Sequence, residues 1–170
     1  MAHCLLAAVS VPSSLSLLSN RTEHNYIIIM NTNDIEKPFN EVTAEDIKNA
    51  LAVDKERETY QELPVIIIDD EEYAVAKNEE TANKAARRAI EDSICYFNPS
   101  FLADHSDVPE DVFVFLANKC FDNNEAYKSM IYDVDDFVDD AIDADGRGHF
   151  LSGYDGEEHE IGEYFLYRIN

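Results

Sequence analysis

The residues best suited to chemistry lie close together near the C-terminus, where Asp143, Asp145, His149 and Asp155 stand among glycines. Carboxylates and imidazoles are the side chains that bind divalent cations in proteins. A calcium-loop register fails, because neither of the first two glycines can take the sixth loop position with an acidic residue at the twelfth. A weaker Mg²⁺ or Ca²⁺ site at Asp143, Asp145 and Asp155 is one alternative. A small metal-dependent enzyme centred on all four residues is the broader alternative.

Two histidines add a zinc site to the alternatives. His149 and His159 flank a carboxylate-rich stretch that contains Asp155, Glu157, Glu158 and Glu160. Two histidines and a carboxylate would bind zinc if the strand register brought them together. Elsewhere we find no serine or cysteine in a recognisable nucleophile context, no phosphate-binding glycine loop and no defensible pair of catalytic carboxylates. We therefore expect no enzymatic activity and no cofactor, and acid–base chemistry by His149 with Asp155 stays open.

Residues 130–143 predict an amphipathic helix with one wholly acidic face. At about 100° per residue, the apolar side chains share one half of the helix and the aspartates share the other. The aspartates are Asp133, Asp135, Asp136, Asp139, Asp140 and Asp143. They span about 15 Å, or one negative charge per roughly 2.5 Å, against one per about 1.7 Å in duplex DNA. Glu157 and Glu158 could supply a second row of charge.

This face has three interpretations. It could be a solvated surface that keeps the protein dissolved, a site for cations, or an electrostatic decoy of the nucleic-acid backbone. A decoy would be offered to the basic groove of a DNA-binding or RNA-binding protein.

The overall charge excludes two classes of partner. The chain has 170 residues, with 36 Asp and Glu against 13 Lys and Arg, so its net charge is −23. Direct binding of nucleic acid needs clustered Lys and Arg, and anionic membranes repel so acidic a protein. Three widely spaced cysteines without a C-x-x-C pair are typical of a reducing cytoplasm. The two internal ones, Cys95 and Cys120, lie in apolar helical patterns and are expected to be buried.

Residues 1–29 differ in composition from the rest of the chain. Their charges cancel, and their apolar run is too short and serine-rich to span a bilayer. They also lack the basic start and the cleavage site of a clear signal peptide. We expect either a targeting segment or an extension ahead of a natural start at Met30, with residues 30–170 as one acidic domain.

The elements that must position these residues form a helical centre between two hairpins. Thr43 and Asp46 predict a capping box that opens a helix over 44–52. Arg147 and Arg168, two of the few cations, are expected to form structural ion pairs. The remaining expected elements are strands over 64–68 and 73–76, helices over 79–97, from 101, over 109–120 and over 124–144, and strands over 148–154 and 162–169. The fold class is α+β, a single domain of three to four helices flanked by hairpins that form one antiparallel sheet.

The C-terminal segment resembles a group of uncharacterised small acidic proteins of bacteriophages and related mobile elements. The shared features are a D-G-R-G-x-F-L segment over Asp145–Leu151, a Y-D-G-x-E segment that begins at Tyr154, and an aromatic ending over Tyr164–Asn170. The resemblance covers about residues 72–170 and implies a phage or prophage origin, but no activity and no catalytic residues.

Charge and resemblance together suggest an inhibitor that is not an enzyme. Small, very acidic phage proteins include DNA mimics that inhibit restriction enzymes and anti-CRISPR proteins that occupy nucleic-acid grooves. We expect a partner among the basic nucleic-acid-binding proteins of the host, in the bacterial cytoplasm, and a homodimer stays open. The alternative is a phage structural or accessory protein whose acidity only aids solubility.

Overall fold

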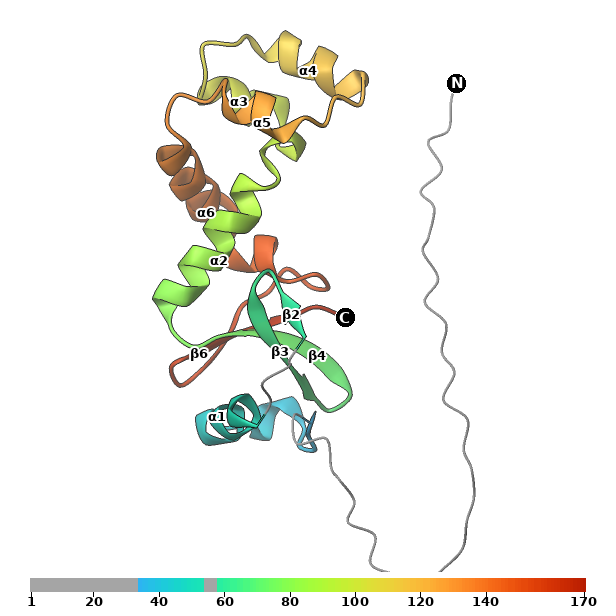
Figure 1. The fold of residues 1–170 in the computed structure, drawn as a ribbon, viewed down its shortest axis with the longest axis vertical. Helices are drawn as coiled ribbons and strands as arrows, with labels where there is room; N and C mark the ends of the chain where they lie inside the picture. Colours follow the sequence, from blue (N-terminus) through green and yellow to red (C-terminus); the bar gives the residue numbers. More distant parts are fainter. Residues whose placement is uncertain (1–33, 54–57) are drawn as a thin grey trace, which may run out of the picture.

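A mixed sheet lies towards one end of the molecule and a group of short helices towards the other (Figure 1). This computed structural model describes residues 34–53 and 58–170. Helices α2 (Glu79–Glu91) and α6 (Val134–Leu151) run side by side between the two ends. The α+β class predicted from the sequence is therefore confirmed.

The predicted hairpin over 64–68 and 73–76 forms the middle of the sheet. Its turn is Asp69–Asp70, where positive φ values of 51° and 64° give the tight turn that matches the twist of a hairpin. The strand order is β1-β3-β4-β6-β5, with β2 paired to β3. The strands are β1 (Asp34–Ile35), β2 (Thr59–Tyr60), β3 (Leu63–Ile68), β4 (Glu71–Ala76), β5 (His159–Ile161) and β6 (Tyr164–Arg168).

The sheet departs from the prediction at one edge. Strand β1 joins β3 in parallel, with Asp34 opposite Ile67, so the sheet is mixed and not purely antiparallel. The sequence did not predict β1, because a strand of two residues with only Ile35 buried is too short to show a strand pattern.

Helices α1 (Ala44–Ala52) and α2 begin at side-chain caps. At α1, the side chain of Thr43 accepts from the amide of Asp46 while the Asp46 carboxylate accepts from the amide of Thr43, which completes the predicted capping box. At α2, the Asn78 side chain accepts from the amide of Thr81 at 2.8 Å. The other helices are α3 (Pro99–Asp104), α4 (Glu110–Asn118) and α5 (Asn124–Lys128), with short 3₁₀ turns at Phe39–Glu41 and Ile94–Tyr96.

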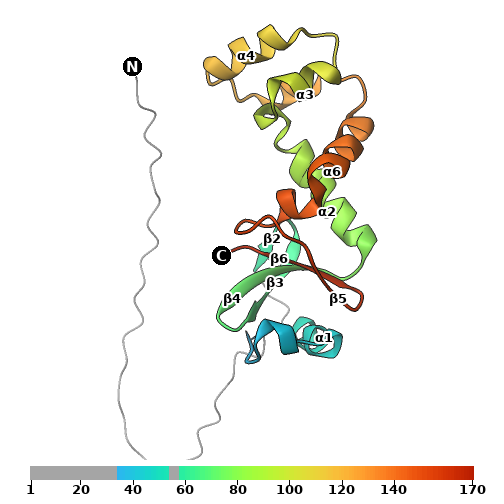
Figure 2. The ribbon, with the colours of Figure 1, turned by 180° about the vertical axis from the view of Figure 1, so that it is seen from behind.

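The sheet is covered on both faces. Along β4, Tyr73 and Val75 pack with α1 on one face, while Ala74 and Ala76 pack with α2 on the other. Figures 1 and 2 show α1 below the sheet and α2 above it. Farther along, the end of α2 meets α6 and the short helices in a separate apolar cluster that includes the buried Phe137.

The predicted long helix over 124–144 is wrong. The structure has α5 and α6 in its place, because the carboxylate of Asp133 accepts from the amides of Asp135 and Asp136 and caps α6 at residue 133. Similarly, the helix predicted over 79–97 ends at Glu91 and continues only as a 3₁₀ turn.

The predicted strand over 148–154 is also wrong. Residues 147–151 are helical and extend α6 beyond a kink at Gly146, whose φ of 77° and ψ of 158° are open only to glycine. A loop over 152–158 then leads to β5, so the last hairpin turns at Gly162 and Glu163.

Some predictions fall outside the described residues, and one more is corrected. Residues 1–29, Met30 and Cys4 lie outside them. The predicted burial of Cys120 is wrong, because the side chain is exposed in the turn after α4, whereas Cys95 is half-buried. Across 34–53 and 58–170, no helix has the length and apolar character to cross a membrane.

Gly148 is a close-packing position that should tolerate no side chain. A Cβ there would lie 2.5 Å from the carbonyl oxygen of Gly156 and 2.9 Å from the amide of Glu158. We predict that Gly148→Ala lowers the free energy of unfolding by about 1–3 kcal/mol, since neighbouring backbone must move. Urea unfolding measures this. Asp145→Ala, at an exposed position of the same helix, is the control and should stay within about 0.5 kcal/mol.

Candidate functional site

The acidic face predicted from the sequence is exposed along α6. All six predicted aspartates, from Asp133 to Asp143, are exposed, while Phe137, Val138 and Ala141 on the opposite side are buried. Burial of the apolar half holds the acidic half towards solvent.

The aspartates of α6 differ in their neighbours. Arg87 of α2 donates to Asp135 and, at 3.3 Å, to Asp139, so these two carboxylates flank a cation. Asp140 lies 3.0 Å from Nε2 of His105. Asp136 and Asp143 form no ion pair with any residue in 34–53 or 58–170. Because Asp136, Asp140 and Asp143 are spaced by four and three residues, they form one stripe along the helix, and none of the three forms an ion pair with Arg87.

A polar groove runs between α2 and α6 beside this stripe. Its volume is about 700 Å³, and its walls include Glu79, Asp139, Asp143, Arg87 and Arg147. Carboxylates outnumber guanidinium groups there, so the groove extends the negative surface beyond the helix itself.

The predicted second row of charge has only one exposed member. Glu157 is exposed, but the Glu158 side chain is 25% exposed and is bound on two sides. Arg147 donates to both of its carboxylate oxygens, at 2.8 and 2.6 Å, and the Tyr167 hydroxyl donates at 2.6 Å. Burial, and then the hydrogen bond to Glu158, raise the pKa of Tyr167. Glu158 is thus a structural residue that joins the C-terminal hairpin to α6.

Arg147 completes this connection between α6 and the C-terminal hairpin, and we call the Arg147–Glu158 pair the joint. Its guanidinium donates to Asn83 of α2 at 2.8 Å and lies 4.8 Å from the ring centroid of Phe165. The prediction of structural ion pairs is confirmed for Arg147, and also for Arg168, whose guanidinium lies 2.6 Å from Glu71 and 4.0 Å from the ring centroid of Tyr154.

The four residues predicted as metal ligands are placed in different surroundings. Asp143 lines the polar groove, whereas Asp145 and His149 line a different cavity of about 680 Å³ beside Phe97. Asp155 lies in the loop after α6. Within 34–53 and 58–170, these four residues do not form a group whose ligand atoms lie within 4.8 Å of one another. The two-histidine alternative depended on a strand register, and the helical course of 147–151 takes His149 out of a strand.

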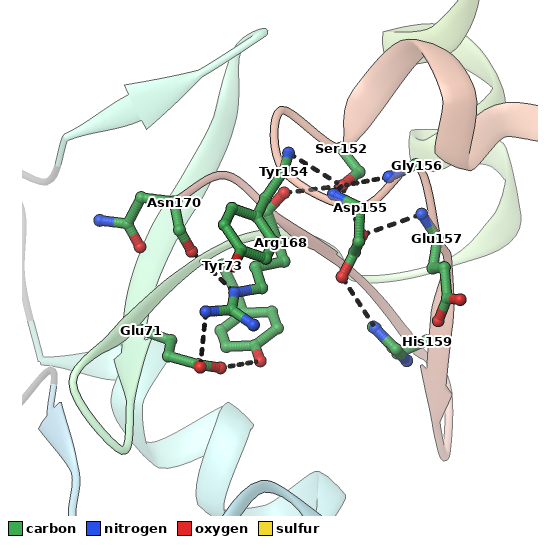
Figure 3. A network of polar contacts seen from close by, with 10 residues as sticks. All are labelled: Glu71, Tyr73, Ser152, Tyr154, Asp155, Gly156, Glu157, His159, Arg168 and Asn170. Carbon is green, nitrogen blue, oxygen red and sulfur yellow. Dashed lines mark hydrogen bonds and ion pairs between the residues drawn. The ribbon is translucent and has the colours of Figure 1, made fainter.

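A different set of metal-ligand types comes together in the loop before β5. Within the part of the chain that the structure describes, Asp155, Glu157 and His159 are the one group of three or more whose ligand atoms lie within 4.8 Å of one another (Figure 3). The alternating D-x-E-x-H spacing is the signal that could have found them, since alternate residues of an extended segment point the same way. Asp155 and Glu157 are exposed and His159 is half-buried.

Asp155 is held in place by its own loop. Its Oδ1 accepts from the Ser152 hydroxyl at 2.7 Å and from the Glu157 amide at 2.9 Å, while Oδ2 lies 4.0 Å from Nε2 of His159 (Figure 3). Although burial raises it, the pKa of Asp155 is lowered overall by these hydrogen bonds and by the nearby imidazole. This network orders the loop that carries Glu157 and Glu158.

Comparison of the chain with protein-family models, curated proteins and solved structures finds no match. We therefore infer the function of this chain from the geometry and charge of its surface.

The joint between Arg147 and Glu158 should be an energetically coupled pair. Arg147→Met removes the cation from the largely buried carboxylate of Glu158, so we predict a loss of about 2–3 kcal/mol in the free energy of unfolding. A double-mutant cycle with Glu158→Gln should give a coupling energy of about 1–3 kcal/mol. Chemical denaturation measures both quantities.

The exposed pair Glu45 and Lys48, with 68% and 64% of each side chain accessible, is the matched control. Its coupling should stay below about 0.5 kcal/mol. Equal coupling energies for the two pairs would contradict a structural role for Arg147.

Proposed function

We propose that this chain is a non-enzymatic inhibitor that occupies the basic nucleic-acid-binding site of a host protein, such as a restriction or CRISPR effector. The observation that carries the proposal is the exposed aspartate face of α6, from Asp135 to Asp143. The resemblance of the C-terminus to small acidic phage proteins supplies the setting, a bacterial cytoplasm in which such a protein meets host defences.

The spacing of charge supports a mimic of a phosphate backbone. The five aspartates of this face from Asp135 to Asp143 extend over about 12 Å, a density within twofold of one charge per about 1.7 Å in duplex DNA. The apolar half of the helix is buried, so the backbone that carries the carboxylates is held in position before a partner arrives. A basic groove that receives a phosphate row would meet carboxylates at comparable intervals.

The outer stripe of Asp136, Asp140 and Asp143 is the part best placed for contact. Arg87 partly neutralises Asp135 and Asp139, whereas no member of the outer stripe forms an ion pair with an arginine within the described residues. Of the second row, Glu157 alone is free to join it, because Glu158 is bound to Arg147.

The net charge of −23 supports long-range attraction as well as contact. A field of one sign speeds the encounter with a basic partner, and this effect weakens as salt shortens the Debye length. A protein whose acidity serves solubility alone would show no dependence on where the charge lies, and this difference separates the two interpretations.

We predict that the triple variant Asp136→Asn, Asp140→Asn and Asp143→Asn loses inhibition. In a DNA-binding assay with a panel of purified restriction and CRISPR effectors, its inhibition constant should rise about tenfold or more at about 100 mM salt, since three clustered charges leave the interface. The wild-type inhibition should itself weaken steeply as salt increases.

The matched control is Glu36→Gln, Glu41→Gln and Glu45→Gln, which removes the same charge from exposed positions near α1. It should change the inhibition constant by less than about threefold. If both triple variants inhibit as the wild type does, the acidic face of α6 is not the inhibitory surface.

A further inference from the structure

Helix α4 carries apolar side chains around its whole circumference but packs on one side only. Phe113 is buried against α3, whereas Val112, Val114 and Phe115 are 39%, 41% and 58% exposed. Figure 1 shows α4 at the outer end of the molecule, with α3 and α5 on its inner side. A helix that is apolar all round is normally covered on all sides.

The turn after α4 enlarges this apolar area. The chain reverses through Cys120, which has a φ of 51°, and the amide of Phe121 donates back to the carbonyl of Leu116 at 3.1 Å. Phe121 is therefore held close to the helix end, where its ring stacks on that of Tyr127 and stays 39% exposed. We call Val112, Phe115 and Phe121 the α4 patch, since Val114 lies about 160° from Val112 around the helix. An exposed patch of neighbouring apolar side chains marks an interaction surface.

The charges on α4 indicate what covers the patch. Asp111, Phe115 and Lys119 follow one another at four-residue spacing, so they form one row with a negative end, an aromatic centre and a positive end. Both charged side chains are exposed, and neither forms an ion pair with a residue in 34–53 or 58–170. The Lys119 ammonium lies 5.5 Å from the ring centroid of Phe115.

This row is complementary to itself when reversed. If a second α4 is laid antiparallel across a two-fold axis at Phe115, Asp111 of each copy faces Lys119 of the other, and the two Phe115 rings meet at the centre. The two helix dipoles then also oppose each other, which is the favourable arrangement. A closed two-fold interface needs a surface that is complementary to itself in this way.

We propose that two copies of this chain associate through α4, packed antiparallel about a two-fold axis at Phe115. The interface consists of the α4 patch and two symmetric pairs between Asp111 and Lys119. It is distinct from the acidic face of α6, and it does not depend on the proposed inhibitory function.

The net charge gives this interface a characteristic response to salt. Two copies with −23 each repel overall, so added salt screens the repulsion and strengthens the association. Docking of α6 on a basic partner weakens with salt, so the two surfaces are distinguished by opposite trends. One nine-residue helix offers less than the roughly 800 Å² per partner of a standard interface, and we expect a dissociation constant of about 10–100 µM.

Charge complementation between two single variants tests the geometry. Asp111→Lys leaves only positive ends on the row and Lys119→Asp leaves only negative ends, so each variant alone should associate at least about tenfold more weakly than the wild type. An equimolar mixture of the two variants should form heterodimers of near wild-type affinity, because both pairs are restored. Sedimentation velocity and native mass spectrometry, from about 5 to about 500 µM protein and from about 50 to about 500 mM NaCl, measure this.

Two further variants separate apolar contact from charge. Phe115→Ser should weaken association by at least about tenfold, whereas Tyr96→Ser, which replaces a side chain that is 75% exposed elsewhere on the surface, should leave it unchanged. Circular dichroism confirms that each variant is folded.

The proposal is overturned if the wild-type chain stays monomeric across these ranges, or if the mixed charge variants show no preference for heterodimers. The first result would indicate that the α4 patch serves contact with a different protein.

Discussion

The bond between Arg147 and Glu158 is the contact on which the arrangement of this molecule depends most. It joins residues from the kinked end of α6 to the segment that leads into β5, and through Asn83 and Tyr167 it reaches α2 and β6 as well. The two side chains are 14% and 25% exposed, so the pair is shielded from water and is worth more than a surface ion pair. Because α6 carries the acidic face, this joint fixes the direction in which that face points relative to the sheet.

Around that joint, the molecule separates its charges by burying apolar surface on the opposite side of the same elements. Phe137, Val138 and Ala141 hold α6 against α2 and α3, and repulsion among the aspartates is directed into water, where salt and solvent screen it. Arg87 reduces the repulsion between Asp135 and Asp139 without covering the outer stripe. At the far end, α4 leaves the apolar side chains of Val112, Val114 and Phe115 exposed between Asp111 and Lys119. The result is one strongly acidic surface along α6 and another, largely apolar one on α4.

Sequence patterns predicted the caps and turns of this structure, and they failed where contacts between separate elements determine the course of the backbone. The capping box at Thr43, the cap at Asn78 and the hairpin around Asp69 depend on a few neighbouring residues, and all three are present. The helical wheel correctly segregated the aspartates of α6, but it could not show that Asp133 would cap the helix. The metal-ligand set that included His149 depended on a strand that the structure replaces with helix, because Gly146 redirects the backbone and Gly148 packs against the loop at Gly156. The pairing of β1 joins Asp34 to Ile67, and the bond of Glu158 to Arg147 joins the end of a helix to the segment before a strand across a loop, so neither follows from the pattern within one helix or strand.

The order of the strands has a consequence for synthesis. Strand β6 lies between β4 and β5, and it pairs Arg168, near the end of the chain, with Tyr73. The β3–β4 hairpin and the helices that follow can form while the chain is still growing, but β4 keeps an unpaired edge until residues 164–168 leave the ribosome. Strand β4 is short and has small alanine side chains on one face, so its unpaired edge is less prone to aggregate with other chains than a strand of large apolar side chains would be. Completion of the sheet and closure of the joint at Arg147 therefore coincide, so that the acidic helix becomes fixed in place only after β6 has been made.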